Sequence, residues 1–133
     1  MLDTDMASYV IKGRSPRVAA RLAEIPPSMV CVSVVTRAEL MYGLKRLPES
    51  HRLQLGVRQF LRLVRVLAWD SDAADYYADI RHQVVMSGQP IGELDMMIAA
   101  HSLSLGAALV TNNTRHYARI AAPLTVVNWT GAT

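Results

Sequence analysis

Cysteine is nearly absent from this sequence, and long apolar runs are absent altogether. The single cysteine, Cys31, lies in an apolar run, and one cysteine cannot build a disulfide framework or a cysteine-based zinc site. No apolar run approaches the ~20 residues that a membrane-spanning helix needs. The chain opens on an acidic segment and lacks the basic start of a signal peptide. We therefore expect a cytoplasmic protein that does not enter a membrane.

Internal repeats, low-complexity tracts and linkers are also missing from the chain. Hydrophobic residues make up 51% of the sequence, which is too many for a disordered protein. A length of 133 residues suits one domain with an ordinary core. We expect residues 1–133 to fold as a single domain.

Lysine is scarce, because only Lys12 and Lys45 among the fourteen basic residues are lysines. Arginine suits phosphate better than lysine does, since its planar fork donates two hydrogen bonds at once. Residues 12–65 contain eleven Lys or Arg against three Glu, whereas residues 66–113 contain one Arg against six Asp or Glu. This pattern suits an enzyme that attracts a polyanion and acts on it with carboxylate-bound metal, although an ordinary solvated surface gives similar counts.

Three arginines, Arg58, Arg62 and Arg65, form a stripe beside the apolar positions of a predicted helix. A stripe of this kind can follow the phosphates of an RNA backbone. It can equally be the solvated face of an ordinary helix, so both interpretations stay open.

Strands and helices are predicted to alternate along the whole chain. The predicted strands are 1–2, 29–35, 64–68, 107–110 and 124–127. The predicted helices are 16–24, 36–45, 49–63, 71–86, 93–105 and 114–120. Such alternation implies βαβ units with right-handed crossovers, and hence a three-layer α/β/α domain with a central parallel sheet of about four to five strands.

Three acidic residues far apart in the sequence lie in or beside apolar segments: Asp3, Glu39 and Asp95. Single acids in these segments have ordinary explanations, because Asp5 can cap a helix, Glu39 can close a capping box with Thr36, and Asp95 can cap a helix or pair with an arginine. Together they are harder to explain, since buried carboxylates need a cation or a full set of donors. We expect them to converge at the carboxyl edge of the sheet and to bind Mg²⁺ or Mn²⁺.

Five segments of the chain, taken in order, resemble PIN-domain ribonucleases, and closely the VapC toxins of bacterial toxin–antitoxin pairs. They are MLDTD at 1–5, VVTRAELMYG at 34–43, IGELDMMIAAH at 91–101, LVTNNTRHY at 109–117, and NW at 128–129. Each segment is loose alone, but jointly they span nearly the whole chain in the family's order. The resemblance implies a PIN-like domain.

The resemblance also implies a metal-dependent endoribonuclease in which Asp3, Glu39 and Asp95 hold the metal and a metal-activated water attacks the phosphodiester. Asp5 stands where the family often has asparagine, so it either adds a ligand or keeps the hydrogen-bonding role. Asn113 lies near the fourth acid of many PIN domains. An amide adds no charge there, which leaves open whether one metal ion binds or two.

Further residues near these segments are candidates for weaker roles. The possible auxiliary or substrate-binding residues are Thr4, Thr111, Asn112 and Arg115. Turn, cap or solvated roles explain each of them equally well. His101 and His116 are expected to be packing or surface residues, because a metal rather than a histidine activates the water.

The resemblance implies three partners: an RNA substrate, a VapB-like antitoxin and a second copy of the chain in a homodimer. One alternative is a PIN-like module that binds RNA or protein without cutting. A second is a haloacid-dehalogenase-type phosphatase with Asp3 as nucleophile. That family needs a lysine and a late acidic pair, whereas this chain has no lysine beyond Lys45 and no acid after Asp95.

Overall fold

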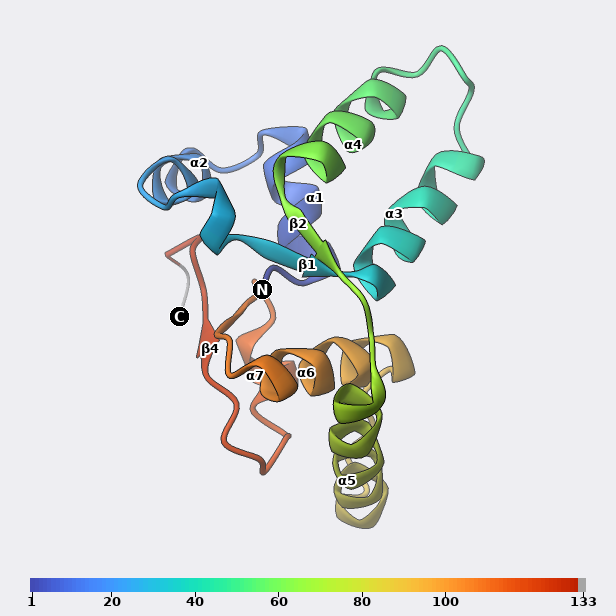
Figure 1. Cartoon of the computed structure of the whole chain (residues 1–133), viewed down its shortest axis with the longest axis vertical. Coiled ribbons are helices and arrows are strands. Elements are labelled where there is room, and N and C mark those ends of the chain that lie inside the picture. Colours follow the sequence, from blue (N-terminus) through green and yellow to red (C-terminus); the bar gives the residue numbers. More distant parts are fainter. Residues whose placement is uncertain (132–133) are drawn as a thin grey trace.

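Short strands alternate with longer helices in the computed structural model, which describes residues 1–131 (Figure 1). The strands are β1 (Cys31–Ser33), β2 (Arg65–Leu67), β3 (Leu109–Val110) and β4 (Val126–Val127). The helices are α1 (Thr4–Lys12), α2 (Pro16–Ala23), α3 (Val34–Lys45), α4 (Arg52–Leu63), α5 (Ser71–Ser87), α6 (Glu93–Leu105) and α7 (Thr114–Tyr117), with a 3₁₀ helix η1 (Pro27–Met29) before β1. The predicted α/β class is confirmed.

Every strand pairing in the described residues is parallel. β1 pairs with β2, with Val32 opposite Val66, and β3 pairs with β4, with Val110 opposite Val127. Leu2 makes single parallel bridges to Val32 and to Val110, so it lies between the two pairs. The order across the sheet is therefore β2, β1, Leu2, β3, β4, and the predicted first strand is reduced to one bridging residue.

The junction between β1 and α3 differs from the prediction. Ser33 Oγ accepts a hydrogen bond from Val35 N at 3.1 Å, so Ser33 caps α3 and the helix begins at Val34. The apolar run had predicted a strand through Val35, followed by a helix opened by Thr36. That prediction was wrong, and so was the capping box, because Thr36 and Glu39 lie inside the helix rather than at its start.

Other boundaries follow the sequence closely. Ser15 Oγ accepts from Val18 N at 3.3 Å and caps α2, as predicted. α6 spans the predicted residues and ends at Gly106, which adopts a left-handed conformation with φ of 62°. Within residues 1–131, no helix is long and apolar enough to cross a membrane.

Two apolar cores cover the two faces of the sheet. Neighbouring strand residues point to opposite faces, so Val32 and Val110 pack against α1 to α4, whereas Cys31 and Leu109 pack mainly against α5 and α6. Figure 1 shows α1 and α4 above β1 and α5 and α6 below it. This layering leaves the carboxyl edge of the strands, where α1, α3 and α7 begin, as the place for a site.

Candidate active site

Asp3 lies where the central bridge of the sheet meets the first helix. It follows Leu2, and its backbone N–H donates to Val110 O at 3.0 Å. Its Oδ1 accepts from Met6 N at 2.8 Å, so Asp3 caps α1 and is buried with only 4% of its surface exposed. Asp5 is exposed in the first turn of the helix. The expectation that Asp5 caps the helix was therefore wrong.

The Asp3 carboxyl group is held in an unfavourable environment for its charge. Burial raises the pKa of Asp3 from 3.8 to about 6, against the hydrogen bonds from the Thr111 side chain and the Met6 backbone, which lower it. The negative charges of Asp5 and Asp95 raise the pKa of Asp3 further. A buried carboxyl group with a raised pKa is typical of functional sites.

The Glu39 side chain on α3 contacts Thr4, the residue that follows Asp3 at the start of α1. The Thr4 hydroxyl donates to Glu39 Oε1 at 2.6 Å, and Thr36 Oγ1 lies 3.0 Å from Thr4 Oγ1. Thr36 is fully buried and Glu39 is half-buried. Thr4 therefore ties the Glu39 carboxylate on α3 to the beginning of α1.

Asp95, in the first turn of α6, is held by two residues of α7. His116 Nε2 lies 3.0 Å from Asp95 Oδ2, and the Tyr117 hydroxyl donates to Asp95 Oδ1 at 3.3 Å. Gly92 is the residue at the N-cap position of α6. The expectation that Asp95 caps this helix or pairs with an arginine was wrong. His116, expected to be a packing or surface residue, packs edge-on against Tyr117 and also contacts Asp95.

Tyr117 lies within reach of the charge of all three acids. Burial raises the pKa of its phenol above the usual range, and the charges of Asp3, Asp95 and Glu39 and the hydrogen bond to Asp95 raise it further. Of the three acids, Asp95 contacts the Tyr117 hydroxyl directly, whereas Asp3 and Glu39 act on it only through their charge.

The donor chemistry of this region fits a hard divalent cation. Carboxylate oxygens are the ligands that Mg²⁺ and Mn²⁺ prefer, and Mg²⁺ usually binds through one or two of them while keeping several waters. In the described part of the chain, none of the three acids pairs with a lysine or arginine. Within residues 1–131, no three His, Cys, Asp or Glu side chains lie in an arrangement that could hold a metal ion.

The remaining candidate residues divide into buried and exposed positions. Thr111 is fully buried, and its Oγ1 accepts from Asn113 N at 2.9 Å. Asn112 donates to the Tyr9 hydroxyl at 3.2 Å, so it ties the loop after β3 to α1. The side chains of Asn113 and Arg115 are exposed.

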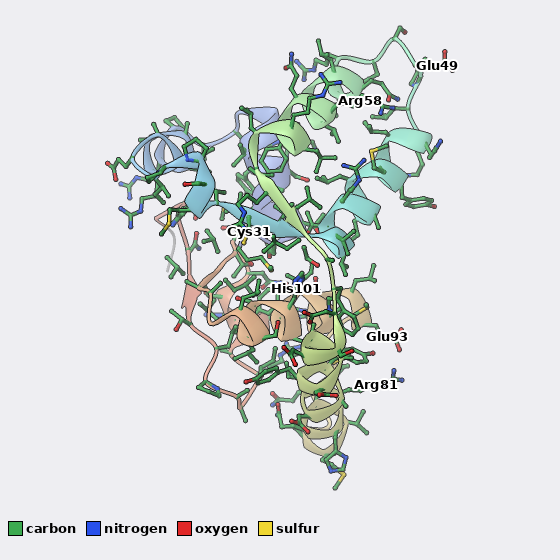
Figure 2. All side chains as sticks on the ribbon, viewed as in Figure 1. Cys31, Glu49, Arg58, Arg81, Glu93 and His101 are labelled. Atoms are coloured by element: carbon green, nitrogen blue, oxygen red, sulfur yellow. The ribbon has the colours of Figure 1, made fainter. Side chains whose placement is uncertain are left out.

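His101 packs inside the protein, as expected. Its Nδ1 lies 2.8 Å from Ser33 Oγ, it is 1% exposed, and it lies between α6 and β1 (Figure 2). Burial lowers the pKa of His101. Sequence reasoning missed His116 and Tyr117 as neighbours of the acids, and the available signal was their place at the end of the 109–117 segment, just after a strand.

Comparison with known proteins agrees with this geometry. Residues 1–123 match the PIN domain family. The tRNA(fMet)-specific endonuclease VapC of Shigella flexneri is 35% identical over 120 residues, which cover 90% of each chain. Ribonuclease VapC2 of Haemophilus influenzae (strain ATCC 51907 / DSM 11121 / KW20 / Rd) is 36% identical over 129 residues, covering 97% of this chain and 96% of that protein.

Solved structures give the same result. The DNA-bound VapBC complex of Salmonella typhimurium contains a chain that superposes with a TM-score of 0.89 at 33% identity, covering 97% of this chain and 96% of that one. VapBC2 of Rickettsia felis, bound to a DNA fragment from its promoter, gives 0.87 at 27% identity, with 97% of each chain covered. The chain therefore belongs to the PIN-domain family and, within it, to the VapC proteins, which confirms the resemblance drawn from its motifs.

Proposed function

We propose that this protein is a VapC-type endoribonuclease toxin that hydrolyses RNA phosphodiester bonds with Mg²⁺ or Mn²⁺. The observation that carries the proposal is the buried Asp3 beside Thr4, whose hydroxyl binds Glu39, with no lysine or arginine paired with Asp3, Glu39 or Asp95 in the described residues. Relatives named as ribonuclease VapC and tRNA(fMet)-specific endonuclease support the reaction class.

In this proposal three acids bind the cation, and neighbouring hydroxyl groups orient the carboxylates of Glu39 and Asp95. Asp3, Glu39 and Asp95 would hold the cation, which when bound lowers the pKa of a water and stabilises charge on the phosphoryl oxygens. Thr4 holds the Glu39 carboxylate at the start of α1 through its 2.6 Å hydrogen bond. Tyr117 keeps the Asp95 carboxylate oriented through its hydroxyl.

Basic side chains beside α3 provide a surface for the RNA backbone. Arg37 from α3 and Arg58 and Arg62 from α4 line one small pocket. All three are exposed, and none makes an ion pair within residues 1–131; Arg58 projects from α4 at the top of Figure 2. Such unpaired guanidinium groups attract phosphates and release counterions on binding.

The experiment is RNA cleavage by the purified chain with Mg²⁺ or Mn²⁺, compared with Asp3→Asn and Asp95→Asn variants. Asparagine keeps the shape and capping ability of aspartate but removes the charge. We expect cleavage to require the metal and to be lost in both variants. Glu24→Gln is the matched control, because Glu24 is an exposed acid that pairs with Arg21 on the surface. Cleavage that survives chelation or both Asn variants would contradict the proposal.

The exposed amide of Asn113 favours one alternative, a PIN-like module that binds RNA or protein without cutting. An amide supplies no charge for a second cation. This alternative replaces the first if the wild-type chain binds candidate RNAs with either metal present and never cuts them.

A VapB-like antitoxin is the proposed protein partner, since structures similar to this chain are VapBC complexes. A cavity of about 530 Å³ between α1, α3 and α4 would receive it. Apolar side chains such as Leu44 and Val57 line this cavity, Lys12 and Arg46 add positive charge, and Glu39 lies at its active-site end. This lining suits an apolar and acidic peptide segment.

We also propose that the chain forms a homodimer. Helix α5 exposes apolar side chains at Tyr76, Val85 and Met86, which are 42%, 68% and 74% exposed. Analytical ultracentrifugation of the purified toxin tests this proposal, and a monomer at all concentrations would contradict it.

A further inference from the structure

Asp95 and His116 place two metal-ligating atoms side by side. His116 Nε2 and Asp95 Oδ2 are 3.0 Å apart. Two ligands at adjacent corners of an octahedral ion, with bonds of about 2.1 Å, also lie about 3 Å apart. The spacing of this pair therefore suits a shared cation as well as a shared proton.

Tyr117 fixes the orientation of both members of the pair. Its hydroxyl donates to Asp95 Oδ1, which leaves Oδ2 turned toward His116. Its ring meets the His116 ring edge-on, with centroids 5.5 Å apart and planes at 84°. The two side chains are thus held close together, and a cation would replace the hydrogen bond that now joins Nε2 to Oδ2.

The pair is open to ions from solvent. The Asp95 side chain is 42% exposed and the His116 side chain 19% exposed. Asp95 forms no ion pair with a lysine or arginine among residues 1–131. A cation can therefore reach the two atoms without displacing a basic side chain.

We propose that His116 is a metal ligand beside Asp95, so that the metal site of this protein contains a nitrogen donor. The inference rests on the proposed function only in requiring that a divalent cation binds. On binding, the pair loses its shared proton to water, and His116 Nε2 and Asp95 Oδ2 each donate a lone pair to the cation. The other positions are left to carboxylate oxygen and water.

A nitrogen donor changes which metal the site prefers. Mg²⁺ takes oxygen ligands almost exclusively, whereas a site with imidazole nitrogen binds first-row transition metals more tightly, Mn²⁺ being the weakest binder of that series. We therefore expect this chain to bind Mn²⁺ in preference to Mg²⁺. Replacing His116 with aspartate makes the site all-oxygen and should bring the two affinities closer together.

The test is electron spin-echo spectroscopy of the full chain loaded with Mn²⁺, without RNA. A nitrogen coupled directly to Mn²⁺ is expected in the wild type and should vanish in His116→Gln and in His116→Asp. His82→Gln is the matched control, because His82 is an exposed histidine on α5. By calorimetry, Mn²⁺ affinity should fall about tenfold or more in His116→Gln, the range seen when support for a metal ligand is lost.

Two results would overturn the inference: a wild-type spectrum without directly bound nitrogen, or one that His116→Gln leaves unchanged. His116→Asp keeps the test valid if the glutamine variant fails to fold. Metal-dependent RNA cleavage without nitrogen coupling removes the histidine ligand but leaves the nuclease intact. Nitrogen coupling without any cleavage supports the ligand and removes the nuclease.

Discussion

The hydrogen bond and the burial of Asp3 act in opposite directions on the ionisation of its carboxyl group. As the cap of α1 it accepts a hydrogen bond from Met6 N, which favours the ionised carboxylate. Its burial disfavours the same charge and is the larger effect, because the pKa of Asp3 rises to about 6. A cation bound beside Asp3 would offset that burial, so the residue is destabilising until the site is filled.

Replacing Asp3 with asparagine should stabilise the metal-free protein at neutral pH. The folded-state pKa of about 6 exceeds the ordinary 3.8, so the stabilisation from the bound proton is complete below pH 3.8 and is lost as the pH rises through about 6. The ionised carboxylate then costs on the order of 2–3 kcal/mol at pH 7. Urea unfolding of the wild type and Asp3→Asn from pH 4 to pH 8 should show the gap opening with pH. A wild type that is equally stable at pH 7 would contradict this prediction.

Thr4→Val should weaken RNA cleavage, because Glu39 loses the hydroxyl that donates to its Oε1 at 2.6 Å. We expect a loss of roughly tenfold or more in kcat/KM, the effect typical of removing a group that orients a metal ligand. Thr4→Ser keeps the hydroxyl and is the control, which should retain most of the activity. Equal activity in the valine and serine variants would argue against this role for Thr4.

At the scale of elements, the junction between β1 and α3 decides where Glu39 lies. Ser33 ends the strand and caps the helix, and its hydroxyl also contacts His101 from α6. One buried side chain therefore joins a strand, the helix that bears Glu39 and the helix that bears Asp95. A change in the position of Ser33 would therefore displace both Glu39 and Asp95.

Ser33→Ala should destabilise the protein more than Ser15→Ala, although both serines cap helices. Loss of a cap costs about 1 kcal/mol. Ser33→Ala should cost on the order of 1–3 kcal/mol more, because His101 Nδ1 is then left buried without its partner. Chemical denaturation of both variants measures the difference, and equal losses would show that the contact with His101 adds nothing.

Local chemistry made some elements predictable and others not. α6 was predicted correctly because Gly106 marks its end and apolar residues repeat along it. The start of α3 was not predicted correctly, because Val34 and Val35 are β-branched and favour a strand by themselves. The Ser33 hydroxyl overrides that preference, and a single capping contact inside an apolar run leaves little trace in the sequence.

At the scale of the whole molecule, the three acids were proposed from the sequence because each lies in a motif shared with a family. The contacts that these acids make with neighbouring residues could not be predicted from the sequence. His116 meets Asp95 across 21 residues, through the packing of α7 against the start of α6. Nothing in the local sequence specifies that contact, since it depends on how two helices meet at the edge of the sheet.

Mn²⁺ should raise the thermal stability of the wild type, because it binds only the folded state. At a hundred times the dissociation constant the gain is about 2.7 kcal/mol. Asp95→Asn should lose most of this gain, and Glu24→Gln, which changes a surface ion pair, should keep it. Differential scanning calorimetry with increasing Mn²⁺ measures the shift, and an unchanged melting temperature in the wild type would contradict metal binding at this site.

Leu2 joins the two halves of the sheet, since it alone bridges β1 and β3 in the described residues. The first residues of the chain therefore find their place only after the segment around Val110 has been made. A growing polypeptide still attached to the ribosome would expose Asp3 with no sheet edge to hold it. The site around Asp3 would thus stay unassembled on the ribosome until the segment around Val110 has been made.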